Sequence, residues 1–259
     1  MIGSGLSPAI VDRYLDRIGV ARPARPTPEA LFELQRAHLR AIPFENASIL
    51  RGEPIPLDLP ALVSKVLDRG RGGFCYELNG LFAALLEALG YTVLRRSARV
   101  FAGDSGIGPP FDHLCLDVPL HGERYLADVG FGYSFLEPLR FVDGAEQDDP
   151  TAPFRLIERP DLDGAVDVEQ RHADGTWRGQ YRIEPGVFEL ADFEPMCEFQ
   201  RTSPEASFIH GWILSRATKD GFVSIHYRKF MVSHGRSVDT RIVDDDAELA
   251  ELVARWFDV

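Results

Sequence analysis

The sequence has few cysteines and no long apolar run, and each of these features excludes a class of protein. Three cysteines in 259 residues are odd in number and too few for a disulfide scaffold in a chain of this size. No apolar stretch reaches the ~20 residues of a membrane-spanning helix, and the N-terminus lacks the basic start and apolar core of a signal peptide. These features predict a reduced, cytoplasmic protein with no membrane partner.

Basic residues are also scarce relative to acidic ones. The 28 Lys and Arg against 40 Asp and Glu give a formal net charge of -12, which repels polyanions and makes nucleic acid a poor candidate partner. The net charge does not exclude a single phosphate-bearing cofactor, because the binding of such a cofactor depends on local N–H groups and a few cations rather than on net charge. Hydrophobic residues make up 45% of the chain, which is typical of a globular protein with a substantial core.

Helical periodicity dominates the first ninety residues. Thr27 followed by Pro28 is typical of a helix start, and Pro43 stops the apolar pattern that follows. Residues 75–89 again place apolar side chains three and four positions apart, and Gly90 is suited to end that helix. The sequence therefore predicts that Cys75 lies at a helix N-terminus.

Beyond residue 90 the pattern changes to strands. Short alternating or β-branched runs separated by turn residues fill positions 91–200 and predict an antiparallel sheet or barrel. The segment 201–259 combines further strand-like runs with a final amphipathic helix after the acidic residues 244–246. We therefore predict an α+β protein with three regions: helices at 1–90, strands at 91–200 and a mixed region at 201–259.

Cys75 has the sequence context of a nucleophile. It stands shortly after two glycines in the segment RGRGGFCYELNG, at the predicted helix start. Glycines let a substrate approach the backbone, and the positive end of a helix favours thiolate over thiol. A free cysteine is more often a small buried core residue, so these local features alone leave the two interpretations about even.

A predicted hairpin brings a histidine and an aspartate together. With a two-residue turn at His121–Gly122, residues whose numbers sum to 243 face each other, so that Cys115 lies opposite Asp128 and His113 opposite Gly130. His113 and Asp128 then become diagonal neighbours on one face, with Cα atoms ~7–8 Å apart. The alternative is a core histidine and a turn aspartate that do not act together.

Cys75, His113 and Asp128 form a chemically consistent set. The carboxylate fixes the tautomer of the imidazole, the imidazole takes the thiol proton, and the thiolate attacks a carbonyl or thioester. Cysteines paired with histidine have pKa values as low as ~3–4, which predicts a thiolate at neutral pH. The order Cys, His, Asp also suits thiol peptidases and transglutaminase-like folds, so it leaves hydrolysis and transfer both open.

Six segments, in the same order along the chain, resemble the arylamine N-acetyltransferase family. The combination of RGGFCYELN with the later histidine strand and the DVGFG strand end is the specific part of this resemblance. The segments are YLDRIG (14–19), IPFEN (42–46), RGGFCYELN (71–79), HLCLDV (113–118), LADVGFG (126–132) and TSPEASF (202–208).

The resemblance implies a fold, a reaction and site residues. The fold is a helical bundle, a β-barrel and an α/β lid, with a cysteine-protease-like catalytic triad of Cys75, His113 and Asp128 between the first two. In the reaction, acetyl-coenzyme A acetylates the cysteine, and an arylamine, arylhydrazine or arylhydroxylamine then attacks the thioester. The resemblance assigns the remaining residues as follows: Phe44, Val100, Phe131 and Phe208 to the substrate pocket, and Gly130, Phe131, Gly132, Thr202 and Ser203 to coenzyme A.

Three other functions compete with this one. An amide synthase of the same fold would release an aminoaryl polyketide from a carrier, and a thiol hydrolase would pass the acyl group to water. A non-catalytic binding module is the third, although binding alone supplies no reason for all three triad residues. No metal site is expected, because His210, His226 and His234 lack the spacing of ligand sets and the cysteines form no CxxC. A monomer or weak homodimer is expected.

Overall fold

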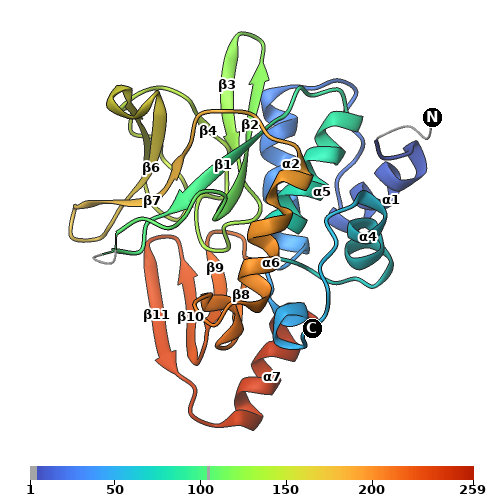
Figure 1. Cartoon of the computed structure of the whole chain (residues 1–259), viewed down its shortest axis with the longest axis vertical. Helices are drawn as coiled ribbons and strands as arrows, with labels where there is room; N and C mark the ends of the chain where they lie inside the picture. The colour runs from blue at the N-terminus through green and yellow to red at the C-terminus, as the bar shows by residue number, and fades with distance from the viewer. Residues whose placement is uncertain (1–4, 104–105) are drawn as a thin grey trace.

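The computed structural model describes residues 5–103 and 106–259, and it begins with a group of helices (Figure 1). Ser7 and Thr27 cap the first two helices by accepting hydrogen bonds from Ile10 N and Ala30 N, each with a proline at the helix start. The predicted helix start at Thr27 is therefore confirmed. The helices are α1 (Pro8–Ile18), α2 (Pro28–Ala41), α3 (Ala47–Leu50), α4 (Leu59–Val63) and α5 (Cys75–Ala88).

A seven-stranded antiparallel sheet follows the helices. Its strand order is β4-β3-β2-β1-β7-β6-β5, and isolated bridges from the loop after β4 to β5 bring the two edges together, so the sheet is nearly closed. The strands are β1 (Leu94–Val100), β2 (His113–Leu120), β3 (Glu123–Ala127), β4 (Leu139–Arg140), β5 (Phe154–Arg159), β6 (Ala165–Arg171) and β7 (Trp177–Ile183).

The hairpin between β2 and β3 has the predicted register. Leu116 pairs with Ala127 and Leu120 with Glu123, which are pairs whose numbers sum to 243. His121 and Gly122 both have positive φ, 52° and 84°, as the two central residues of a type I′ turn require. This turn fixes which face of β2 carries the side chain of His113.

The C-terminal part consists of α6 (Glu194–Thr202), a four-stranded antiparallel sheet and α7 (Asp246–Phe257). The segment 221–233 forms two strands that are separated by a turn at Tyr227, where φ is 58°. Apolar side chains of the sheet pack against Leu249, Val253 and Phe257 of α7. The strands, in the order β11-β10-β9-β8, are β8 (Ile213–Ala217), β9 (Phe222–His226), β10 (Lys229–His234) and β11 (Ser237–Ile242).

The three parts meet around the N-terminal end of α5. In Figure 1 the helices lie beside the seven-stranded sheet, the four-stranded sheet lies below both, and α6 crosses between them. The predicted α+β class is confirmed. The boundaries at residues 90 and 200 stay a prediction about folding units, and α6 continues across the second of them. Among the described residues, no helix combines the length and the apolar character needed to cross a membrane.

Candidate active site

Cys75 is the first residue of α5 and is 4% exposed. The two glycines before it serve a different purpose from the one expected. A Cβ on Gly72 would collide with the carbonyl oxygen of Pro43, and one on Gly73 would lie 2.7 Å from a carboxylate oxygen of Glu77. The glycines therefore admit protein atoms, not substrate, and they let the chain before Cys75 pack tightly against its neighbours.

A buried charge cluster stands behind this turn, formed by Glu45, Lys65, Arg71 and Glu77. Glu77 accepts a hydrogen bond from Phe74 N at 3.1 Å, which caps α5, and its carboxylate also contacts Lys65 Nζ at 2.8 Å. Arg71 donates to Glu45 at 2.7 Å. Burial raises the pKa of Glu77, and Lys65 opposes that shift. Each member has an oppositely charged partner, as buried ions require.

His113 and Asp128 form the hydrogen bond that the hairpin predicts. His113 Nε2 lies 2.7 Å from Asp128 Oδ2, and both side chains are nearly inaccessible to solvent. Burial alone would raise the pKa of Asp128, yet His113 and the hydrogen bonds to the carboxylate hold it below its usual value. An ionised carboxylate only accepts, so the proton lies on Nε2 and Nδ1 is left as the basic nitrogen.

Three further groups donate to the Asp128 carboxylate. Tyr181 Oη donates to Oδ2 at 2.9 Å, while Asn79 Nδ2 and Gly130 N donate to Oδ1 at 2.8 Å each. Asn79, on α5, also accepts from Val129 N at 2.9 Å and so ties the helix to the loop after β3. Asn79 therefore supports both the carboxylate and the loop that follows it. Tyr181 was missed, because only the pairing of β7 with β1 brings it to the site.

Gly130 allows the strand end to approach α5 closely. An added Cβ would lie 2.8 Å from the Cα of Cys75 and 2.7 Å from Nδ2 of Asn79. The loop after β3 therefore packs directly on the backbone that carries the thiol. Gly132, with φ 91°, continues this loop past the ring of Phe44.

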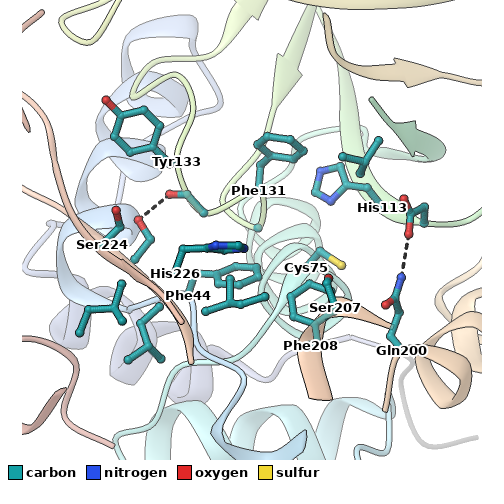
Figure 2. A pocket seen from close by; sticks show the side chains of 18 of the residues that line it. Phe44, Cys75, His113, Phe131, Tyr133, Gln200, Ser207, Phe208, Ser224 and His226 are labelled. Atoms are coloured by element: carbon teal, nitrogen blue, oxygen red, sulfur yellow. Dashed lines mark hydrogen bonds between the residues drawn. The ribbon is translucent and has the colours of Figure 1, made fainter. Parts of the chain in front are cut away.

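A cavity of about 370 Å³ opens in front of Cys75 (Figure 2). In Figure 2 the sulfur of Cys75, the ring of His113 and the ring of Phe131 all lie at this cavity. The rings of Phe44 and Phe208 are 6.2 Å apart, and the rings of Phe131 and His113 are 5.2 Å apart and nearly perpendicular. The volume is in the range of small-molecule sites, and the wall is mostly apolar.

The predicted pocket residues have different outcomes. The cavity is lined by Phe44, Val100, Gly130, Phe131, Gly132 and Phe208, together with Cys75 and His113. Thr202 and Ser203 do not line it: the Thr202 hydroxyl donates to the carbonyl of Glu198 at 2.7 Å, and the Ser203 hydroxyl accepts from Glu205 N. The functions assigned to these residues stay predictions.

The environment of the Cys75 thiol does not favour the ionisation at neutral pH that the sequence predicts. Burial raises the pKa of Cys75 well above its ordinary value, and the negative charge of Asp112 adds to this shift. Within residues 5–103 and 106–259, the hydrogen bonds of the site include none between Cys75 and His113. Burial and the charge of Asp112 both favour the thiol over the thiolate, so ionisation of Cys75 depends on transfer of its proton to the imidazole.

Asp112 and Gln200 are among the polar residues of the cavity that sequence reasoning missed. Asp112, which precedes β2, faces the cavity and accepts a hydrogen bond from Gln200 Nε2 of α6 at 2.7 Å. This bond is the dashed line at Gln200 in Figure 2. Because Asp112 and Gln200 are 88 positions apart, no local pattern relates them. In the part of the chain that the structure describes, no group of three or more His, Cys, Asp or Glu side chains is placed to hold a metal ion.

Comparisons with known proteins identify the family of this chain. A model of the N-acetyltransferase family matches residues 27–259. The chain is 33% identical to an arylamine N-acetyltransferase of Mycolicibacterium smegmatis over 252 residues, which cover 95% of this chain and 90% of the relative. It belongs to the arylamine N-acetyltransferase family. The predicted family and enzyme class are thereby confirmed.

Solved structures of the family have the same fold. The arylamine N-acetyltransferase of Salmonella typhimurium superposes with a TM-score of 0.89 at 31% identity, covering 98% of this chain and 92% of that one. The Mycobacterium marinum enzyme in complex with CoA also gives a TM-score of 0.89, at 30% identity and with 96% and 92% coverage.

Proposed function

We propose that this protein transfers an acetyl group from acetyl-coenzyme A to an arylamine, arylhydrazine or arylhydroxylamine through a thioester on Cys75. The observation that carries the proposal is the 2.7 Å hydrogen bond between His113 and the buried Asp128 at the cavity that holds the thiol. The family membership supports the choice of acetyl-coenzyme A as donor and of an aromatic amine as acceptor. Because the reaction needs a reduced thiol, we expect it to take place in the cytoplasm.

The first half-reaction begins with a proton transfer. His113 Nδ1 takes the proton of Cys75, and the thiolate forms together with an imidazolium that Asp128 stabilises. We expect the contact between sulfur and nitrogen to form in the substrate complex, because catalytic hydrogen bonds often tighten only when substrate binds. The thiolate then attacks the acetyl carbonyl, and the coenzyme A sulfur leaves and receives the proton from His113.

The second half-reaction uses the same groups in reverse. The acceptor nitrogen attacks the thioester carbonyl of acetylated Cys75 and loses a proton to His113. The tetrahedral intermediate collapses, the cysteine sulfur leaves as thiolate, and His113 returns the proton to it. The product is the acetylated amine, and the enzyme regains its starting state.

The aromatic wall favours transfer over hydrolysis. Phe208 packs edge-on against Phe74 with ring centroids 5.7 Å apart, and Phe131 covers the His113 ring. These rings leave little polar surface on which water could be held beside the thioester. An aromatic acceptor can stack in the same space, which gives it the advantage over water.

The proposal is tested by product analysis. The enzyme is incubated with acetyl-coenzyme A and aniline, and acetanilide and free acetate are quantified. We expect acetanilide as the main product, with parallel lines in double-reciprocal plots at several aniline concentrations, as a ping-pong reaction requires. Free acetate as the main product would support the hydrolase, and turnover only with longer acyl thioesters would support the amide synthase.

Two variants serve as controls for this experiment. Cys75→Ala is expected to form no product, whereas Cys197→Ala is expected to keep normal turnover, because Cys197 lies on α6 outside the cavity. Equal loss in both variants would indicate that the cysteines act through stability, and the assignment of the nucleophile would fail.

A further inference from the structure

Among the described residues, the cavity in front of Cys75 contains one carboxylate and two histidines, His113 and His226, but no Lys or Arg. The carboxylate belongs to Asp112. No Lys or Arg of the described part of the chain forms an ion pair with Asp112 either. In the cluster of Glu45, Lys65, Arg71 and Glu77, by contrast, every charged side chain has an oppositely charged partner.

Asp112 is held in one position from several sides. Gln200 of α6 donates to Oδ1 at 2.7 Å, and the hydroxyl of Tyr76, on α5, lies 3.3 Å from the main-chain oxygen. Gly108 packs so closely against the carboxylate that a Cβ there would collide with Oδ2. The acidic group is therefore a fixed feature of the cavity wall.

A partly buried carboxylate that forms no ion pair is unfavourable by itself. Burial raises the pKa of Asp112, although hydrogen bonds, the neighbouring His113 and the more distant charge of Arg99 oppose the shift. The same negative charge raises the pKa of the Cys75 thiol and so works against catalysis. A ligand that brings a positive charge into the cavity would offset both effects.

We propose that Asp112 is a specificity-determining residue, which selects acceptors whose aromatic ring carries a second, cationic group such as an amidinium. The ring would lie among Phe44, Phe131 and Phe208, with the cation at Asp112. This inference rests on the proposed acetyl transfer. The coenzyme A thioester is anionic and is repelled by Asp112, and it leaves before the acceptor enters, so the carboxylate acts on the acceptor.

The test uses two acceptors of nearly equal shape. 4-Aminobenzamidine is cationic at pH 7.5 and 4-aminobenzamide is neutral, and kcat/KM is measured for each with saturating acetyl-coenzyme A. The ratio of the two values cancels the overall activity of a variant. Asp112→Asn is expected to lower the amidine-to-amide ratio by about tenfold or more, the effect of losing a hydrogen bond between charged groups.

A matched variant and a second measurement keep the result interpretable. Glu198→Gln removes the same charge from α6 outside this cavity, and its ratio is expected to stay at the wild-type value. Independently of any variant, benzamidine should inhibit the wild-type enzyme more strongly than benzamide, in competition with the acceptor. This comparison remains decisive if Asp112→Asn does not fold.

Failure of this inference is distinguishable from failure of the proposed function. Absence of acetyl on wild-type Cys75 after exposure to acetyl-coenzyme A overturns the transfer reaction. Normal acetylation with an unchanged ratio in Asp112→Asn overturns the role of Asp112, as does equal inhibition by benzamidine and benzamide. A raised KM for acetyl-coenzyme A with an unchanged ratio would also overturn it, because the residue would then serve the donor.

Discussion

The charged side chains on the two sides of the α5 N-terminus differ in whether they form ion pairs. Behind Cys75, the buried cluster pairs each acid with a base within 4.0 Å and caps the helix. In front of it, the cavity is aromatic and leaves the Asp112 carboxylate without an ion-pair partner among the described residues. We infer that the side with ion pairs stabilises the start of the helix and that the side without them binds a ligand. Substitutions on the two sides should therefore affect different properties.

The largest effect is expected for Asp128→Asn, at the boundary between the two sides. An amide at this position favours the wrong imidazole tautomer and faces the donors Asn79, Gly130 and Tyr181. We expect the rate of Cys75 acetylation to fall by about 10³- to 10⁴-fold, the loss seen when a triad aspartate is made neutral. Stopped-flow release of coenzyme A measures it. A loss of less than tenfold would show that Asp128 does not orient the base.

Lys65→Met removes one cation from the buried charge cluster behind Cys75. This variant leaves Glu77 without its buried counter-ion, whereas Glu45 keeps Arg71, and we expect the free energy of unfolding to fall by about 3–5 kcal/mol. Urea denaturation measures this change. The double variant Lys65→Met/Glu77→Leu should recover much of the loss, and Asp112→Asn, on the side without ion pairs, should change stability by less than ~1 kcal/mol. Equal destabilisation by Lys65→Met and Asp112→Asn would remove the contrast between the two sides.

Phe208→Ala tests the aromatic side chains that line the cavity in front of Cys75. Removing this ring opens the space above the thioester, and we expect water to hydrolyse acetylated Cys75 about tenfold faster, which corresponds to ~1.4 kcal/mol of barrier. The decay of the acetylated form in the absence of amine is followed by mass spectrometry. Phe199→Ala, at an exposed position on α6, is the control and should leave the decay unchanged.

The smallest effect concerns the charge beside the thiol. Because Asp112 raises the pKa of Cys75, Asp112→Asn should lower that pKa and increase the thiolate fraction at any pH below it. We expect alkylation of Cys75 by iodoacetamide to become about two- to threefold faster at pH 7, with the rate still rising towards higher pH. Slower alkylation in this variant would contradict the sign of the interaction.

The pairing of His113 with Asp128 could be predicted from sequence because it depends on short-range geometry. A two-residue turn at His121–Gly122 fixes the register of the hairpin, and the register fixes which residues share a face. The start of α5 at Cys75 and the α+β class were predictable for similar reasons, since caps and periodicity are local signals.

The other parts of the site depend on contacts between distant segments. Tyr181 reaches Asp128 only because β7 pairs with β1, and Gln35 of α2 accepts from Asp128 N at 3.0 Å across 93 positions. The packing role of Gly72 and Gly73 requires knowledge of the residues that approach them. The raised pKa of Cys75 depends on burial, which the motif around the cysteine does not reveal.

The central claim is that the thiol of Cys75 carries the acetyl group between donor and acceptor. It is tested most directly by exposing the pure protein to acetyl-coenzyme A without amine and mapping the modification by peptide mass spectrometry. The account predicts a gain of about 42 Da on the peptide that contains Cys75, which disappears when aniline is added. Rapid product formation without any acetyl on Cys75, or acetylation that aniline does not remove, would contradict it.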